Sequence, residues 1–353
     1  MKRILPILVC LLISFSSKAT PPHFYPADNS LFRYTGRIDF SNEKLPRFWA
    51  SGVYIEAAFE GKSCEIQLND EMLYGKYHNY ITVVIDDEQP QRIKLTGKTN
   101  ALTITAKTNK KTHKILICKT TESGIGYLEF LGLKCEKLLP LAPAPSRKIE
   151  FIGNSITCGM GSDESVIKCD KGEWYDQHNA YLSYGAITAR SLNAQWQLSS
   201  VSGIGLIHSC CNLTIKMPQV FDKIYMREDS IKWNFKNYVP DVVTVCLGQN
   251  DGIQDSATFC SAYVKFITQL RSHYPKATIV CLTSPMADEK LVAVLKNQLT
   301  SIVAAVKKSG DENINSYFFS KRYHNGCGDH PDLEDHLQIA NELTAYLKKL
   351  KKW

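Results

Sequence analysis

Two hydrophobic patterns follow one another along the chain, and the first of them indicates β-structure. From about Leu31 to Leu138, short segments rich in β-branched and aromatic residues alternate with turn-forming stretches. The segments predicted as strands span residues 47–61, 63–68, 79–87, 91–97, 101–107 and 113–122. Because no helical pattern interrupts them, these strands predict an antiparallel β-sandwich.

The second pattern begins at Lys148, where apolar runs alternate with amphipathic stretches. Strands are predicted around residues 149–152, 194–205, 242–247, 277–285 and 316–320. Helices are predicted at residues 179–193, 257–275, 288–310 and 332–350. About five strands with flanking helices are typical of an α/β domain with a mostly parallel sheet.

A proline-rich stretch separates the two patterns. The nine letters LPLAPAPSR at residues 139–147 contain three prolines, which disfavour a regular element. We therefore predict a β-sandwich domain over residues 20–138, a linker over 139–147 and an α/β domain over 148–353. Since proline stiffens a linker, we expect the sandwich to keep a limited range of orientations and to form one wall of the catalytic cleft.

The N-terminal segment has the pattern of a secretory signal peptide, predicted over residues 1–19. Lys2 and Arg3 precede a short apolar segment, which ends in small residues. The apolar segment is too short for a convincing membrane span. We therefore expect a soluble product that starts near Thr20 and is secreted or periplasmic.

The charge of the mature chain excludes some partners. Removal of Lys2, Arg3 and Lys18 with the signal segment lowers the formal net charge from +7 to about +4, which is mild for this length. No stripe of basic residues interleaved with aromatic residues supports nucleic-acid binding. We expect neither a nucleic-acid partner nor membrane insertion after signal cleavage.

Cysteine usage is unusual for an exported protein. Of twelve cysteines, eleven remain after signal removal, so at least one is unpaired. Pairings of Cys158 with Cys169 and with Cys327 are both considered, and we predict neither, because the connectivity cannot be deduced from the sequence. No CxxC pair indicates zinc, and no metal site is predicted.

Residues with reactive side chains lie at the ends of the predicted strands. Ser155 follows one apolar run, Asn250 follows another, and His330 precedes Pro331 and the last predicted helix. Taken singly, each also fits a structural role as a helix cap, a turn residue or a loop residue. Together they supply a hydroxyl nucleophile, an amide donor and an imidazole base, which are the parts needed for acyl transfer.

Four blocks that carry these residues resemble the SGNH (GDSL-type) hydrolases, and most closely carbohydrate esterase family two. The blocks are GNSITCGMG, VSGIGL, GQND and GCGDHP, in the family's order. The resemblance covers nearly the whole chain. It implies an N-terminal jelly-roll sandwich followed by a flavodoxin-like SGNH domain, and an acetyl xylan esterase-like activity.

The resemblance also implies roles for individual residues. Ser155 is the expected nucleophile and His330 the expected base. The expected oxyanion hole consists of the amides of Ser155 and Gly203 and the side chain of Asn250, with Gly205 as the alternative to Gly203. No metal and no organic cofactor is implied, because these groups suffice for ester hydrolysis.

One position departs from the pattern of many SGNH hydrolases, which place an aspartate two or three residues before the histidine. Here those positions hold Gly328 and Cys327, and the aspartate is Asp329. Adjacent side chains usually point in different directions, so we favour a Ser-His dyad with a backbone carbonyl behind the imidazole. Asp329 remains an outside candidate for orienting His330.

Three further side chains receive provisional roles. Trp174 and Tyr175, which follow the nucleophile block, are candidates for stacking on a sugar ring or for sealing the domain interface. His336, near the start of the last helix, is interpreted as a packing or helix-terminal residue. His178 and His208 have no partner pattern and stay unassigned.

The sequence therefore predicts an exported serine esterase that removes O-acetyl groups from plant polysaccharide, such as xylan or glucomannan, or from derived oligosaccharides. One alternative is an SGNH esterase that acts on another acyl substrate. A second alternative, from a different class, is a largely non-catalytic protein that binds polysaccharide.

Overall fold

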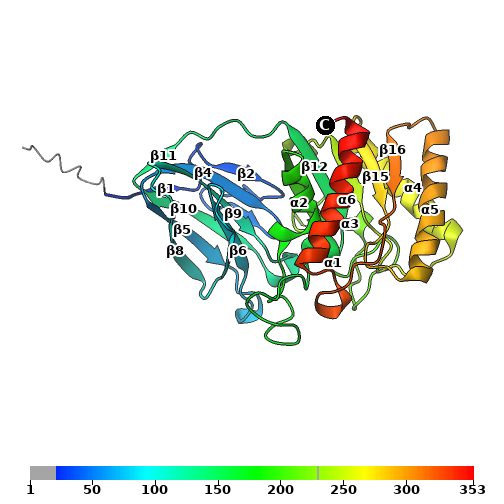
Figure 1. Cartoon of the computed structure of the whole chain (residues 1–353), viewed down its shortest axis with the longest axis horizontal. Helices are drawn as coiled ribbons and strands as arrows, with labels where there is room; N and C mark the ends of the chain where they lie inside the picture. The colour runs from blue at the N-terminus through cyan, green and yellow to red at the C-terminus, as the bar shows by residue number, and fades with distance from the viewer. Residues whose placement is uncertain (1–20, 229) are drawn as a thin grey trace, which may run out of the picture.

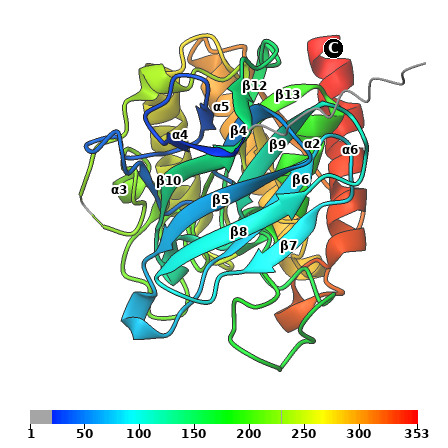
Figure 2. The ribbon, with the colours of Figure 1, turned by 90° about the vertical axis from the view of Figure 1, so that its left-hand side faces the viewer.

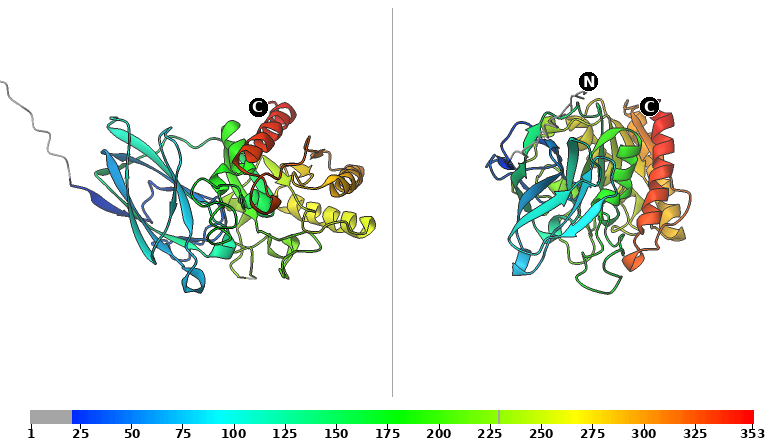
Figure 3. Two further views of the ribbon diagram at one scale, coloured as in Figure 1. Left: turned by 60° about the horizontal axis from the view of Figure 1, so that its bottom comes forward. Right: turned by 60° about the vertical axis from the view of Figure 1, so that its left-hand side comes forward.

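The computed structural model describes residues 21–228 and 230–353. The predicted signal segment, residues 1–19, lies outside the described residues. Figure 1 shows two parts side by side along the long axis, an all-β part in blue to cyan and an α/β part in green to red. Two further views in Figure 3 show the same arrangement.

The β-part is a sandwich of two antiparallel sheets. The first sheet has the order β1-β10-β5-β8, with β3 paired to β10. Its strands are β1 (His23–Pro26), β3 (Arg47–Phe48), β5 (Ser63–Asp70), β8 (Thr99–Thr105) and β10 (Leu128–Cys135). Figure 2 views the molecule from this side, with β5 and β8 in front.

The second sheet has the order β11-β4-β9-β6-β7, with β2 paired to β4. Its strands are β2 (Arg33–Thr35), β4 (Tyr54–Glu60), β6 (Tyr80–Ile85), β7 (Gln91–Lys94), β9 (Thr112–Lys119) and β11 (Lys137–Leu139). Two 3₁₀ turns, η1 (Leu73–Gly75) and η2 (Ser123–Ile125), lie in the connections. Alternating side chains of β5, namely Cys64, Ile66 and Leu68, enter the core between the sheets.

The α/β part contains one parallel sheet of five strands in the order β13-β12-β14-β15-β16. They are β12 (Arg147–Gly153), β13 (Ala194–Ser200), β14 (Val242–Val245), β15 (Thr278–Leu282) and β16 (Ile314–Tyr317). The chain runs from β12 to β13 on one side and then to β14 on the other. Such a switch in strand order opens a crevice at the carboxyl ends of the strands.

Helices cover both faces of this sheet. The helix α2 (Tyr184–Ser191) packs with α6 (Leu333–Lys351), whereas α4 (Ser256–His273) packs with α5 (Glu289–Lys308). The shorter elements are α1 (Ser155–Cys158), α3 (Met217–Val220), η3 (Ala180–Leu182), η4 (Phe235–Asn237) and η5 (Cys327–Asp329). The predicted fold class, a β-sandwich followed by an α/β domain with a parallel sheet, is confirmed.

Some predicted elements differ in their bounds. The helix expected over residues 179–193 is divided into η3 and α2, because Ser183 adopts an extended backbone (φ −71°, ψ 155°) and becomes the N-cap of α2. The last strand covers residues 314–317 instead of 316–320. The stretch between β11 and β12, residues 140–146, contains no helix or strand, and β12 begins at Arg147.

The two parts are joined by a buried polar and aromatic interface. Tyr54 of β4 stacks on Trp196 of β13 with ring centroids 4.0 Å apart, and the Trp196 indole donates to the carbonyl of Gly52 at 2.9 Å. Arg37, which follows β2, is fully buried and forms an ion pair with Glu150 of β12 at 3.1 Å. Both contacts tie the sandwich to the strand pair that leads into the site described below.

Across residues 21–228 and 230–353, none of the helices combines the length and the apolar character required to cross a bilayer.

Candidate active site

Ser155 lies just beyond the end of β12, an inner strand of the parallel sheet. The strand β12 ends at Gly153, Asn154 caps the short helix α1 through its side chain, and Ser155 is the first helical residue. Gly153 leaves room for this turn, since a Cβ atom there would lie 2.1 Å from Thr157 Oγ1. The backbone therefore presents the Ser155 hydroxyl at the carboxyl edge of the sheet.

His330 reaches Ser155 from the loop before α6. Its Nε2 atom lies 2.9 Å from Ser155 Oγ, and its Nδ1 atom lies 3.0 Å from the Gly328 carbonyl oxygen and 3.2 Å from that of Cys327. Carbonyl oxygens only accept hydrogen bonds, so Nδ1 carries the proton and Nε2 accepts the serine hydroxyl. Burial lowers the pKa of His330 below its ordinary value of 6.5.

Asp329 does not contact His330. Its side chain is exposed, and its carboxylate faces His324 at 4.0 Å. The residue adopts a left-handed backbone with φ +56°, which turns its side chain away from the imidazole. The carbonyls of Gly328 and Cys327 occupy the orienting position for which Asp329 was the outside candidate.

The VSGIGL block and the GQND block meet beside Ser155. The Asp251 carboxylate accepts the backbone amides of Leu206, Ile207 and His208 at 2.7 to 3.0 Å and so holds the loop in place. One hydrogen of the Asn250 amide group is donated to the carbonyl of Ile204 at 2.7 Å. The second hydrogen of this group is available to a ligand.

Gly203 and Gly205 have different surroundings. Gly203 adopts φ +82° and lines the cavity that contains Ser155. The Gly205 amide instead donates to Ser209 Oγ at 3.0 Å. Gly205 is required for close packing, because a Cβ atom there would lie 1.8 Å from the His208 carbonyl oxygen.

A disulfide joins the loop after α1 to the histidine loop. Its partners are Cys169 and Cys327, whereas Cys158 is buried and unpaired, so neither pairing considered for Cys158 from the sequence is correct. Within the described ranges, the one group of three potential metal ligands combines these two cysteines with Glu164. Because both sulfur atoms are in the disulfide, they offer no thiolate to a metal ion.

A cavity of about 350 Å³ contains Ser155, Gly203, Asn250 and His330 together. Trp174, the predicted candidate for a sugar contact, also lines the cavity and is 42 % exposed. The structure brings these five predicted residues together from five separate segments of the chain.

Tyr175 is the exception among the predicted site residues. Its side chain is 1 % exposed, its hydroxyl accepts the His78 amide at 3.1 Å, and it packs with Tyr80 and Ile125 of the sandwich. The proposed stacking role for Tyr175 is therefore wrong. A buried aromatic at the domain interface cannot present its face to a sugar, and only its alternative role as an interface residue agrees with its position.

The unassigned His208 and the predicted packing residue His336 have structural partners. His208 Nδ1 lies 3.0 Å from the Asn250 carbonyl oxygen. His336 Nδ1 accepts the Tyr184 amide at 3.1 Å, and burial lowers its pKa to about 3. His336 is thus a neutral packing residue that fixes the start of α2, in line with its interpretation from the sequence.

Two charged residues of the cavity were not predicted from the sequence. Glu122 comes from the sandwich and is fully buried, and Arg227 follows α3. Neither position carries a motif, because each reaches the site only through the packing of distant segments. Burial alone would raise the pKa of Glu122, but His178 and the hydrogen bonds from Ser202 lower it to about 2.

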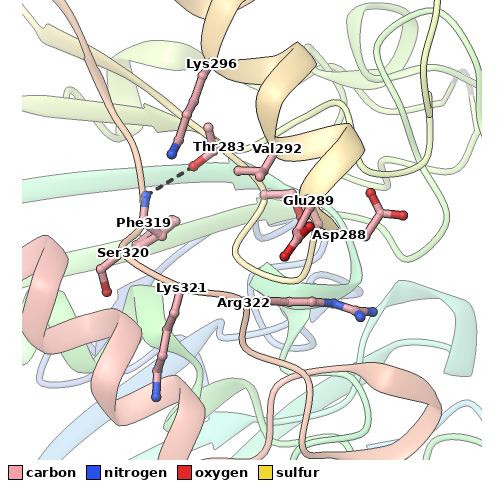
Figure 4. A pocket seen from close by; sticks show the side chains of 11 residues that line it. Thr283, Asp288, Glu289, Val292, Lys296, Phe319, Ser320, Lys321 and Arg322 are labelled. Atoms are coloured by element: carbon pink, nitrogen blue, oxygen red, sulfur yellow. Dashed lines mark hydrogen bonds between the residues drawn. The ribbon is translucent and has the colours of Figure 1, made fainter.

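A larger cavity, of about 550 Å³, lies at the ends of β15 and β16 beside the start of α5 (Figure 4). On its buried side the Phe319 amide donates to Thr283 Oγ1 at 3.2 Å. Acidic and basic side chains both line its open side, among them Glu289 and Lys321. Ser155 and His330 line the smaller cavity, so the candidate active site is assigned there on chemical grounds.

Two family models match the chain. Residues 34–145 match "Carbohydrate esterase 2 N-terminal", and residues 151–335 match "GDSL-like Lipase/Acylhydrolase family". The second match alone covers more than half of the chain and includes Ser155 and His330.

Similar proteins and structures agree with these matches. The chain is 31 % identical over 337 residues to the cellulase/esterase CelE of Acetivibrio thermocellus. The aligned region covers 92 % of the chain but only 40 % of CelE, which is a longer protein. It is 28 % identical to an acetylxylan esterase / glucomannan deacetylase of Cellvibrio japonicus, over the full length of both.

Among solved structures, a family two carbohydrate esterase from Clostridium thermocellum in complex with cellohexaose has a TM-score of 0.83 at 29 % identity. This match covers 91 % of the chain and 99 % of that structure. The four sequence blocks, the sandwich in front of the parallel sheet and these matches lead to one assignment. The chain belongs to the GDSL-like lipase/acylhydrolase family, in the branch formed by the family two carbohydrate esterases.

Proposed function

We propose that the protein is an exported serine esterase that removes O-acetyl groups from plant polysaccharide, with xylan and glucomannan as the expected substrates. The observation that carries the proposal is the 2.9 Å contact between Ser155 Oγ and His330 Nε2, inside a cavity that Gly203 and Asn250 also line. The signal-peptide pattern of residues 1–19 supports export.

In the proposed reaction, Ser155 Oγ attacks the acetyl carbonyl carbon while His330 Nε2 takes the hydroxyl proton. Collapse of the tetrahedral intermediate breaks the ester bond, and His330 returns the proton to the departing sugar oxygen. Water, deprotonated by the same imidazole, then hydrolyses the acetyl-serine to acetate. The carbonyls of Gly328 and Cys327 hold the Nδ1 proton throughout, so His330 keeps the tautomer in which Nε2 is the base.

The negative charge on the carbonyl oxygen is proposed to be stabilised by the amides of Ser155 and Gly203 and the free hydrogen of the Asn250 amide group. Gly203 is preferred over Gly205 as the second amide donor. Gly203 lines the cavity, whereas the Gly205 amide is already donated to Ser209.

The substrate class rests on the relatives and on Trp174. Similar proteins are named acetylxylan esterase / glucomannan deacetylase, and a similar structure was solved with cellohexaose. The exposed Trp174 ring beside the cavity offers an apolar face for a pyranose ring.

The proposal is tested by acetate release from acetylated xylan, acetylated glucomannan and a small aryl acetate. We expect the protein to release acetate from all three, with the highest kcat/KM on a polymer, because Trp174 contributes binding only with a sugar. Hydrolysis of the aryl acetate alone would contradict the substrate class. No hydrolysis of any ester, with retention on the polymers in affinity electrophoresis, would favour a binding protein.

The pH dependence of kcat/KM should report His330 in the free enzyme. The base must be neutral, and burial lowers its pKa, so activity should rise with pH through a midpoint below 6.5 and then stay level. Two groups act on this pKa in opposite senses, since His178 lowers the pKa of His330 and Glu122 raises it. A midpoint at or above 7 would show that another group limits the reaction.

A further inference from the structure

A segment of the sandwich, residues 120–124, forms part of the wall of the catalytic cavity. The carbonyl of Thr120 accepts the Ala180 amide of the α/β domain at 3.1 Å, and Glu122 and Gly124 line the cavity. Lys119 holds this segment in place. Its side chain is fully buried, and Nζ donates to the carbonyls of Thr121 and Glu122 at 2.9 and 3.1 Å. The segment is therefore held rigidly against the site.

The carboxylate of Glu122 spans the boundary between the two domains. Its Oε2 atom accepts the Ser202 backbone amide at 2.8 Å and the Cys158 thiol at 3.7 Å. Its Oε1 atom lies 3.5 Å from His178 Nε2. One side chain of the sandwich thus contacts the loop before Gly203, the helix α1 that begins with Ser155, and the loop after it.

The contact with Ser202 sits next to the proposed oxyanion donor. Gly203 has no side chain and adopts φ +82°, so the position of its amide depends on its neighbours. On the C-terminal side of this residue, the Gly203 carbonyl accepts the Cys210 amide at 2.9 Å. On the N-terminal side of Gly203, the carboxylate of Glu122 accepts the backbone amide of Ser202. A charged acceptor forms a stronger hydrogen bond than a neutral one, particularly away from water.

We propose that Glu122 is a positioning residue, through which the β-sandwich holds the Ser202–Gly203 turn in the geometry needed for the oxyanion hole. This role rests on the esterase activity proposed above. It makes the sandwich a working part of the catalytic site, since the acceptor of the Ser202 amide comes from the sandwich. The substrate is unchanged: in this role Glu122 acts on the acetyl ester through the backbone of Gly203, and its carboxylate also raises the pKa of His330.

The first test compares the kinetics of two variants with the wild-type protein. Glu122→Ala removes the acceptor, and we expect kcat for an aryl acetate to fall about 100-fold, the typical cost of a misplaced or lost oxyanion donor, with KM nearly unchanged. Glu122→Gln keeps an amide oxygen as a neutral acceptor and should lose only about tenfold. A rise in KM without a loss of kcat would overturn the proposal.

A matched control separates positioning from general stability. Glu56 is another buried carboxylate of the sandwich, paired with Lys114 at 2.6 Å and Arg33 at 3.5 Å. Glu56→Gln should lower the melting temperature while kcat stays within about twofold, because its contacts lie away from the cavity. Equal losses of kcat in the Glu56 and Glu122 variants would show that Glu122 affects activity only through the stability of the fold, which would contradict the proposal.

A second measurement does not depend on activity. Hydrogen–deuterium exchange of the peptide that contains Ser202 and Gly203 should accelerate at least about tenfold in Glu122→Ala and remain unchanged in Glu56→Gln. Unchanged exchange in the Glu122 variant would contradict the proposal even if the enzyme were active. If the wild-type protein hydrolyses no ester but exchange is accelerated in Glu122→Ala, the esterase function is refuted, whereas the positioning of the Ser202–Gly203 turn by Glu122 is supported.

Discussion

His330→Ala should lower kcat for acetyl-ester hydrolysis by about 10⁴-fold or more, whereas Asp329→Asn should change it by less than about twofold. The loss corresponds to about 5.5 kcal/mol of transition-state stabilisation. His330 is the single side chain within hydrogen-bond distance of Ser155 Oγ in the described part of the chain. In the proposed mechanism it takes and returns the proton in both half-reactions.

Asp329→Asn is the matched control, because asparagine tolerates the left-handed backbone at this position as well as aspartate does. The substitution removes only a charge that faces solvent and His324. Steady-state kinetics on an aryl acetate measure both variants, with circular dichroism as the check on folding. A large loss of kcat in Asp329→Asn with the fold intact would replace the dyad by a triad.

Arg37→Met should lower the free energy of unfolding by about 3–5 kcal/mol, which is a large share of the stability of an ordinary domain. The Arg37 guanidinium donates to Glu150 at 3.1 Å, to Ser199 Oγ at 3.1 Å and to the carbonyl of Phe221 at 2.6 Å. Neither member of the ion pair is exposed. Loss of the arginine leaves the Glu150 carboxylate buried without a counter-charge, which costs more than the pair itself contributes.

Urea unfolding followed by tryptophan fluorescence measures this effect. Lys111→Met provides the surface control, since Lys111 pairs with Glu60 at 3.0 Å but is 81 % exposed, and its loss should cost less than about 1 kcal/mol. The double variant Arg37→Met/Glu150→Leu should recover much of the stability. Equal costs for Arg37→Met and Lys111→Met would show that the buried pair does not hold the domains together.

The layers of the fold and most residues of the candidate site were predictable from local sequence. Period-two strands and amphipathic helices carry their own signal. Ser155 and Asn250 follow the ends of strands, and His330 precedes the last helix. Because the carboxyl ends of parallel strands meet at one edge of a sheet, motifs that are far apart in sequence arrive in one cavity.

Features that depend on packing between distant segments were not predictable in the same way. Glu122 follows a sandwich strand, and its place beside Ser202 arises only when the domains dock. The same reason applies to the Cys169–Cys327 disulfide, whose partners are 158 residues apart. Tyr175 and Trp174 are adjacent in sequence, yet one is buried against Tyr80 and the other faces the cavity, and no periodicity distinguishes them within a loop.

The central claim is that Ser155 is the nucleophile, and covalent labelling tests it most directly. A fluorophosphonate probe should form a bond between phosphorus and Ser155 Oγ with release of fluoride, and peptide mass spectrometry identifies the labelled residue. We predict that the label is found on Ser155 alone, that acetate release falls in proportion to labelling, and that Ser155→Ala neither reacts nor releases acetate. Acetate release that persists in the fully labelled protein or in Ser155→Ala would contradict the account.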